Sequence, residues 1–109
     1  MSEFEDLLKK FEPDKESLQP DQPKALILVV DDDESIRRGL GRVFSHKYEV
    51  LTSECGRDAV ETLSDAVHCV ILDVKMKELN GFATYPKLKA KSPNVPIIFY
   101  TAFQSEHDL

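Results

Sequence analysis

Acidic residues that could hold a cation or attack phosphorus stand directly after two apolar runs. Asp31–Asp33 follow the run Ala25–Val30, and Asp73 follows the run Val67–Leu72. Clustered carboxylates repel one another, and a divalent cation that prefers oxygen ligands relieves the repulsion. Mg²⁺ suits such a site, because it keeps several waters and needs few protein carboxylates. A carboxylate beside the ion can then act as a nucleophile toward a phosphoryl group.

The segments that would position these acids alternate between strand-like and helix-like patterns. Four strands are predicted, over Ala25–Val30, Tyr48–Thr52, Val67–Leu72 and Pro96–Tyr100. Helices are predicted over Glu34–His46, Arg57–Ala66 and Gly81–Lys91, with the start of another over Phe103–Leu109. The alternation predicts an α/β fold, a doubly wound parallel sheet with helices on both faces. The carboxyl ends of parallel strands meet at one edge, so the acids and Thr101 are expected to converge there.

Each of these residues also has a purely structural interpretation. Acids before a helix commonly cap it, and for Asp33, Glu34 and Ser35 that is the favoured role. An aspartate after a strand, such as Asp73, is usually a turn residue, and a single threonine such as Thr101 is usually structural. The joint occurrence at three strand ends is what favours a functional site.

The composition is that of one small acidic globular domain. The chain has 109 residues, of which 41% are hydrophobic, and a formal net charge of −6. No basic patch is dense enough to suggest nucleic-acid contact, and the longest apolar run is too short to span a membrane. The N-terminus lacks the basic-then-apolar layout of a signal peptide, so a cytoplasmic location is expected.

The first 24 residues differ from the rest and are expected to form an arm and linker. Pro13, Pro20 and Pro23 mark an extended linker, and the domain itself is expected over residues 25–109. Apolar residues at helical spacing over Glu3–Phe11 fit either a solvated arm or a docking or dimerising helix. The sequence does not choose between these two.

Three segments in order resemble the receiver domain of bacterial two-component response regulators. They are LILVVDDDESIRR (Leu26–Arg38), VILDVKMKELNG (Val70–Gly81) and VPIIFYTA (Val95–Ala102). The resemblance spans about three quarters of the chain and implies the flavodoxin-like receiver fold, with strand order 2-1-3-4 for the strands present. It implies a signalling domain rather than an enzyme, with Mg²⁺-dependent self-phosphorylation and slow dephosphorylation as side activities. The implied partner is a sensor histidine kinase or a phosphotransfer protein.

The resemblance also assigns roles to individual residues. Asp73 is implied to accept the phosphoryl group from a phosphohistidine. Asp32 and Asp73 would bind Mg²⁺ directly, Asp31 would act largely through water, and the backbone carbonyl of Lys75 would complete the protein ligands. Thr101 would be the switch hydroxyl, which bonds a phosphoryl oxygen and moves inward on phosphorylation.

Three features depart from the family's pattern. Lys77 stands where the family usually has proline, and an exposed lysine is expected there. Pro86 falls inside the predicted helix Gly81–Lys91, which therefore either starts late, near Tyr85, or is kinked. The sequence ends before the family's fifth strand and fifth helix. In the family, the fifth strand carries a lysine that pairs with the acceptor and an aromatic switch residue.

Without a fifth strand, Pro96–Tyr100 would be an edge of the sheet with uncovered apolar area. We therefore expect either a homodimer built on this edge and residues 103–109, or an incomplete chain. The alternative to the signalling role is then a phosphorylation-independent interaction or dimerisation module. A Mg²⁺-dependent phosphotransferase or phosphatase ranks below both, because it usually needs an acid/base aspartate two residues after the nucleophile, where Lys75 stands.

Overall fold

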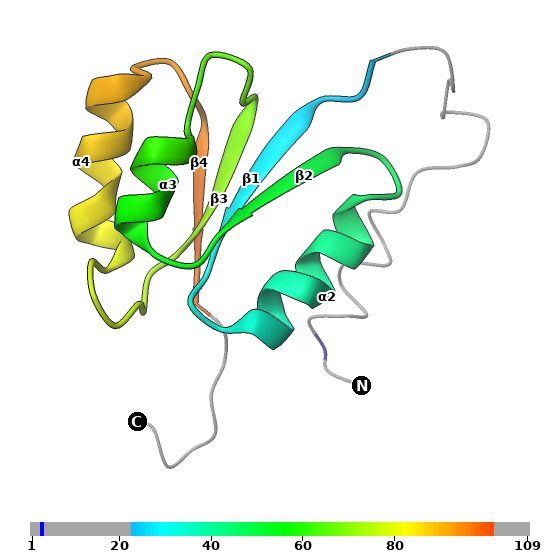
Figure 1. Cartoon of the computed structure of the whole chain (residues 1–109), viewed down its shortest axis with the longest axis horizontal. Helices are drawn as coiled ribbons and strands as arrows, with labels where there is room; N and C mark the ends of the chain where they lie inside the picture. Colours follow the sequence, from blue (N-terminus) through cyan, green and yellow to red (C-terminus); the bar gives the residue numbers. More distant parts are fainter. Residues whose placement is uncertain (1–2, 4–22, 102–109) are drawn as a thin grey trace.

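The chain folds around a four-stranded parallel sheet. The structure is a computed structural model that describes residue 3 and residues 23–101. Its strands are β1 (Leu26–Val30), β2 (Glu49–Ser53), β3 (Cys69–Asp73) and β4 (Ile97–Tyr100), arranged in the order β2-β1-β3-β4 (Figure 1). Every neighbouring pair is parallel, which confirms the predicted fold class and strand order.

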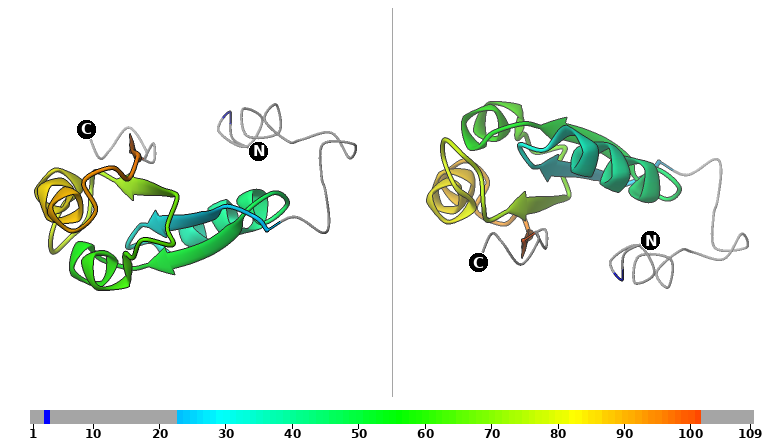
Figure 2. Two further views of the ribbon diagram at one scale, coloured as in Figure 1. Left: turned by 90° about the horizontal axis from the view of Figure 1, so that it is seen from above. Right: turned by 90° about the horizontal axis from the view of Figure 1, so that it is seen from below.

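Helices cover both faces of this sheet. They are α2 (Glu34–Phe44), α3 (Gly56–Thr62) and α4 (Gly81–Lys91). Figure 2 shows α3 and α4 together on one side of the sheet and α2 on the other. Among the described helices, none has the length and apolar character that crossing a membrane requires. The helices predicted over Glu3–Phe11 and Phe103–Leu109 lie outside the described residues, apart from Glu3.

The central strand β1 divides the core into two clusters because its side chains alternate between the faces. Leu28 and Val30 belong to the larger cluster, which α3 and α4 cover, while Ile27 and Val29 belong to the smaller one under α2. All four side chains are buried. A continuous apolar run is what a strand covered on both faces requires, so this feature followed from the sequence.

The carboxyl ends of β1 and β3 lie side by side at one edge of the sheet. The backbone N–H of Asp31 donates to the Ser53 carbonyl at 3.1 Å, and the N–H of Val74 donates to the Tyr100 carbonyl at 2.9 Å. These bonds continue the strand pairing one residue past β1 and β3. They fix where the acidic residues leave the sheet.

Two predicted elements have different boundaries in the structure. The helix predicted over Arg57–Ala66 is the shorter α3, because Leu63 turns to an extended conformation (ψ 131°) and buries its side chain in the larger cluster. The third strand begins at Cys69 and includes Asp73, so Asp73 is its last residue rather than the first one after it.

Helix α4 begins at Gly81, so the late start near Tyr85 is wrong. The side chain of Asn80 caps the helix by accepting from the N–H of Ala83 at 2.8 Å. Pro86 lies inside the helix, where it has no N–H to donate to the carbonyl of Phe82. Phe82 and Pro86 are both exposed, so this side of the helix faces solvent.

Replacing Pro86 by alanine is expected to stabilise the fold by about 1–2 kcal/mol. Alanine restores the helical hydrogen bond and removes the ring's clash with the preceding turn, while the unfolded chain regains some freedom and reduces the gain. Urea unfolding of the two proteins measures the difference. Lys87→Ala, at the exposed neighbouring position, is the control and should change stability by less than about 0.5 kcal/mol. A destabilised Pro86→Ala protein would contradict the expectation.

Candidate cation and phosphoryl site

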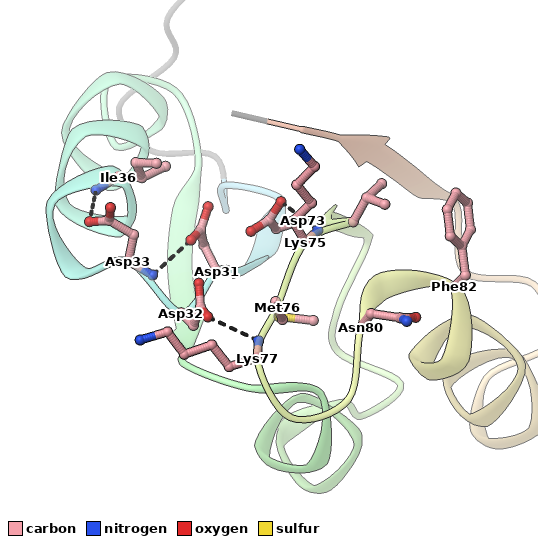
Figure 3. Close-up of a pocket in the computed structure, with 11 residues that line it drawn as sticks. Asp31, Asp32, Asp33, Ile36, Asp73, Lys75, Met76, Lys77, Asn80 and Phe82 are labelled. Carbon is pink, nitrogen blue, oxygen red and sulfur yellow. Dashed lines mark hydrogen bonds between the residues drawn. The ribbon is translucent and has the colours of Figure 1, made fainter. Parts of the chain in front are cut away.

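A pocket opens at the carboxyl edge of the sheet, between the loop after β1 and the loop from β3 to α4. Figure 3 shows the side chains around it. The residues that line it are Asp31, Asp32, Asp33, Ile36, Asp73, Val74, Lys75, Met76, Lys77, Asn80 and Phe82. Sequence segments that lie about 40 residues apart therefore form one site, as expected when parallel strands end at a common edge.

Three carboxylates meet in this pocket. One oxygen from each of Asp31, Asp32 and Asp73 lies within 4.8 Å of the other two. Asp31 and Asp73 are buried, with 1% and 4% of their surface exposed. The atoms that could bind a metal here are all carboxylate oxygens. Such ligands suit a hard divalent cation such as Mg²⁺. The site therefore fits the ion that the resemblance implies.

Asp31 is held by hydrogen bonds to both of its carboxylate oxygens. The backbone N–H of Asp33 donates to Oδ1 at 2.8 Å, and the Tyr100 hydroxyl donates to Oδ2. The Arg37 guanidinium, one turn into α2, also donates to the backbone carbonyl of Asp31 at 2.7 Å. Asp31 is thus tied to β4 and to α2 as well as to its own loop.

Asp32 and Asp73 each accept from a backbone N–H of the loop between β3 and α4. The N–H of Lys77 donates to Asp32 Oδ2 at 3.1 Å, and the N–H of Lys75 donates to Asp73 Oδ1 at 3.1 Å (Figure 3). Proline, which the family usually has at the position of Lys77, could not make the first of these bonds. The lysine is exposed, as expected, but its backbone links the two loops.

Burial sets the ionisation of the pocket. Burial first, and then the neighbouring charges of Asp31 and Asp32, raise the pKa of Asp73 to about 6, against the hydrogen bond from the N–H of Lys75. Burial likewise raises the pKa of Asp31, against the hydrogen bonds from Tyr100 and Asp33. The pKa of Tyr100 is also raised, by burial first and then by Asp31, so its hydroxyl stays a proton donor. The pocket therefore holds its negative charge at a cost that a cation would relieve.

Without a divalent cation, the fold is expected to gain stability as the pH is lowered from about 8 to about 5. The contribution of Asp73 is fully present below its unfolded pKa near 4 and is lost as the pH rises through about 6, because its folded pKa is raised. Asp33 has the opposite sign, but its pKa lies below 3.8, so its contribution is lost only at more acidic pH. Urea unfolding in EDTA measures the trend. A protein whose stability falls steadily over this range would contradict it.

The other residues that the sequence singled out lie at different points around the pocket or outside it. Asp33 caps α2, accepting from the N–H of Ser35 at 2.9 Å and of Ile36 at 3.4 Å, so its structural interpretation is confirmed. Lys75 lines the pocket. Thr101 directly follows β4 and is exposed, but it is not among the residues that line the pocket.

Sequence reasoning missed Tyr100. The sequence pattern places this residue only in the fourth strand, yet its hydroxyl reaches the most buried carboxylate of the site. The available signal was a polar hydroxyl at the end of the otherwise apolar run Ile97–Tyr100, next to Thr101. A strand end facing an acidic pocket is a place where a tyrosine can satisfy a buried oxygen.

Comparison with known proteins finds relatives that all belong to one family. The protein-family model described as the response regulator receiver domain matches residues 27–109 of this chain. Response regulator SaeR of Staphylococcus epidermidis is 35% identical over 83 residues, and SaeR of Staphylococcus aureus (strain USA300) is 32% identical over 83 residues. Each match covers 75% of this chain and 36% of the relative. The chain therefore spans about a third of the length of the curated relatives it matches.

Solved structures agree with this result. The chemotaxis protein CheY4 of Vibrio cholerae superposes with a TM-score of 0.67 at 28% identity, covering 78% of this chain and 74% of that one. The non-phosphorylated HemR receiver domain of Leptospira biflexa also gives 0.67, at 29% identity, with 78% and 70% covered. The family match extends over most of the sequence, and the fold and the acidic pocket accord with it. This chain therefore belongs to the response regulator receiver domain family of two-component signalling systems.

Proposed function

We propose that the chain accepts a phosphoryl group on Asp73 with Mg²⁺ bound at Asp31, Asp32 and Asp73. The observation that carries this proposal is the meeting of the three carboxylates within 4.8 Å, two of them buried. Acceptance on an aspartate is general for receiver domains, which are signalling domains rather than enzymes in the usual sense. The donor in this proposal is a phosphohistidine on a sensor histidine kinase or phosphotransfer protein.

The hydrogen bonds of the site indicate which oxygens are available. Oδ1 of Asp73 and Oδ2 of Asp32 each accept from a loop N–H, and among the described hydrogen bonds their second oxygens take part in none. We assign the second oxygen of Asp32 to the cation and the second oxygen of Asp73 to the attack on phosphorus. Bound Mg²⁺ would offset the charge on the phosphoryl oxygens. Lys75 would add its backbone carbonyl as a further ligand.

In the proposed transfer, an oxygen of Asp73 attacks the phosphorus atom and forms a new O–P bond. The P–N bond to the donor imidazole breaks, and the nitrogen keeps the electron pair. Asp73 must be ionised to attack, which its raised pKa of about 6 permits at neutral pH. Thr101 would then turn its hydroxyl toward a phosphoryl oxygen. That movement would change the surface around β4.

A small phosphodonor, such as acetyl phosphate, tests the proposal. Incubation with the donor and Mg²⁺ should place one phosphoryl group on Asp73, located by mass spectrometry of peptides, and EDTA should prevent it. Beryllofluoride with Mg²⁺ should also shift the amide signals of Asp73 and Thr101. Mg²⁺ binding with neither modification nor shift would contradict phosphoryl acceptance.

The second candidate is an interaction module that does not depend on phosphorylation. Within residues 23–101, β4 is an edge strand, and Ile98 on it is 54% exposed. A homodimer through this edge would cover that side chain. Residues 103–109, the other expected part of the interface, lie outside the described residues. Light scattering at dilute concentration tests this candidate, and a monodisperse monomer would contradict it.

A cytoplasmic location without direct nucleic-acid contact completes the proposal. Cys55 and Cys69 are both free thiols, which suits a reducing compartment. The formal net charge of −6 disfavours contact with a phosphate backbone. Fractionation of the source cells would test the first point, and filter binding at low salt would test the second.

A further inference from the structure

The Tyr100 hydroxyl connects β4 to Asp31, the residue after β1, although β4 and β1 are not neighbours in the sheet. In the order β2-β1-β3-β4, β3 lies between β1 and β4, and Tyr100 is paired in register with Asp73 at the end of β3. The bond from Tyr100 to Asp31 therefore crosses the end of the strand that carries the proposed acceptor. The Tyr100 ring also packs against the cluster under α2, which holds its side chain in place.

Asp31 differs from the other two carboxylates in its hydrogen bonds. Its Oδ1 accepts from the N–H of Asp33 and its Oδ2 from Tyr100, so both oxygens already have a protein donor. Asp32 and Asp73 each have one such donor among the described residues. A carboxylate held at both oxygens and 1% exposed cannot turn without breaking one of these bonds.

We propose that Tyr100 is a positioning residue that limits how Asp31 serves a cation and thereby makes the pocket selective for Mg²⁺ over Ca²⁺. The inference rests on the proposed cation binding. Mg²⁺ is satisfied with one or two carboxylates and retained waters, whereas Ca²⁺ takes roughly six to eight oxygen ligands in a flexible arrangement. Holding Asp31 at both oxygens stops this carboxylate from turning to offer both oxygens to one ion. The loss of a flexible, bidentate ligand costs Ca²⁺ more than Mg²⁺.

The substitution Tyr100→Phe removes the hydroxyl and leaves the ring. Phenylalanine keeps the ring that packs against the buried cluster under α2, so the fold should survive. It frees Oδ2 of Asp31, and that carboxylate can then turn toward an ion. Tyr48→Phe is the matched control, because Tyr48 packs in the same cluster and lines no part of the acidic pocket.

The test measures Mg²⁺ and Ca²⁺ affinities of the full chain by calorimetric or amide-shift titration. Tyr100→Phe should raise the ratio of Ca²⁺ affinity to Mg²⁺ affinity by about tenfold, within the range known for groups that orient a ligand. Tyr48→Phe should leave the ratio unchanged. The chain has no tryptophan, so its intrinsic fluorescence comes from its three tyrosines. Saturating Mg²⁺ should alter that emission in the wild type and much less in Tyr100→Phe.

An unchanged ratio, or equal weakening of both ions, would overturn the selectivity role and leave Tyr100 as packing alone. Should Tyr100→Phe fail to fold by circular dichroism, Tyr100→Leu removes the same hydroxyl and is judged by the same ratio. A wild-type chain that binds neither ion would instead contradict the proposed function. The two failures are therefore distinguishable from the wild-type titration.

Discussion

Asp73→Asn is expected to abolish phosphoryl loading and, in the absence of a divalent cation, to stabilise the fold. The amide has the shape of the carboxylate and can still accept from the N–H of Lys75, but it is not a nucleophile toward phosphorus. It also removes one of three crowded negative charges. Since the pKa of Asp73 is raised to about 6, we expect a gain of about 1 kcal/mol at neutral pH after allowing for solvent screening.

Mass spectrometry after incubation with acetyl phosphate and Mg²⁺ measures the loading, and urea unfolding in EDTA measures the stability. Asp65→Asn is the matched control, because Asp65 is an exposed acid in the turn before β3 and lies outside the pocket. It should load normally and unfold like the wild type. Undiminished loading of Asp73→Asn would place the acceptor on another residue.

Gly81→Ala is expected to destabilise the fold by about 2–4 kcal/mol. A Cβ at Gly81 would collide with the carbonyl oxygen of Asp73 and lie 2.9 Å from the Cα of Val74. Both atoms belong to the backbone and cannot move aside as a flexible side chain would. The effect is steric, since among the described residues no glycine has a positive φ. The same collision would displace the end of β3 and so reduce Mg²⁺ affinity.

Gly39→Ala is the control for this prediction. Gly39 lies inside α2, and a Cβ there meets nothing within 4 Å. Alanine should therefore stabilise the chain by up to about 1 kcal/mol through its higher helix propensity. Thermal or urea unfolding of both variants gives the comparison. Equal behaviour of the two substitutions would show that the close approach of α4 to β3 is wrong.

Local patterns in the sequence were sufficient for most of the fold. The run Leu26–Val30 is apolar at every position because both faces of β1 are covered, and this pattern alone predicts a central parallel strand. The alternation of strands and helices then predicts a doubly wound sheet. The strand order came from the family resemblance, and the structure confirms it.

Boundaries were less predictable because packing, not local preference, decides them. Leu63 continues the helical spacing of apolar residues in α3, yet it leaves the helix so that its side chain enters the core. Pro86 should discourage a helix, yet α4 runs through it, because the Asn80 cap and the buried Leu88 hold the helix on either side. In both elements tertiary contacts outweigh the local signal.

The sequence by itself determined the fold class, the strand ends at which acids stand, and the family. These depend on the order of residue types along the chain and on the rule that parallel strands end at one edge. Only the tertiary structure decided which donors hold the carboxylates. The bonds from Tyr100 to Asp31 and from Lys77 to Asp32 join residues 69 and 45 positions apart. Such pairs form when separate elements pack together, and no local periodicity encodes them.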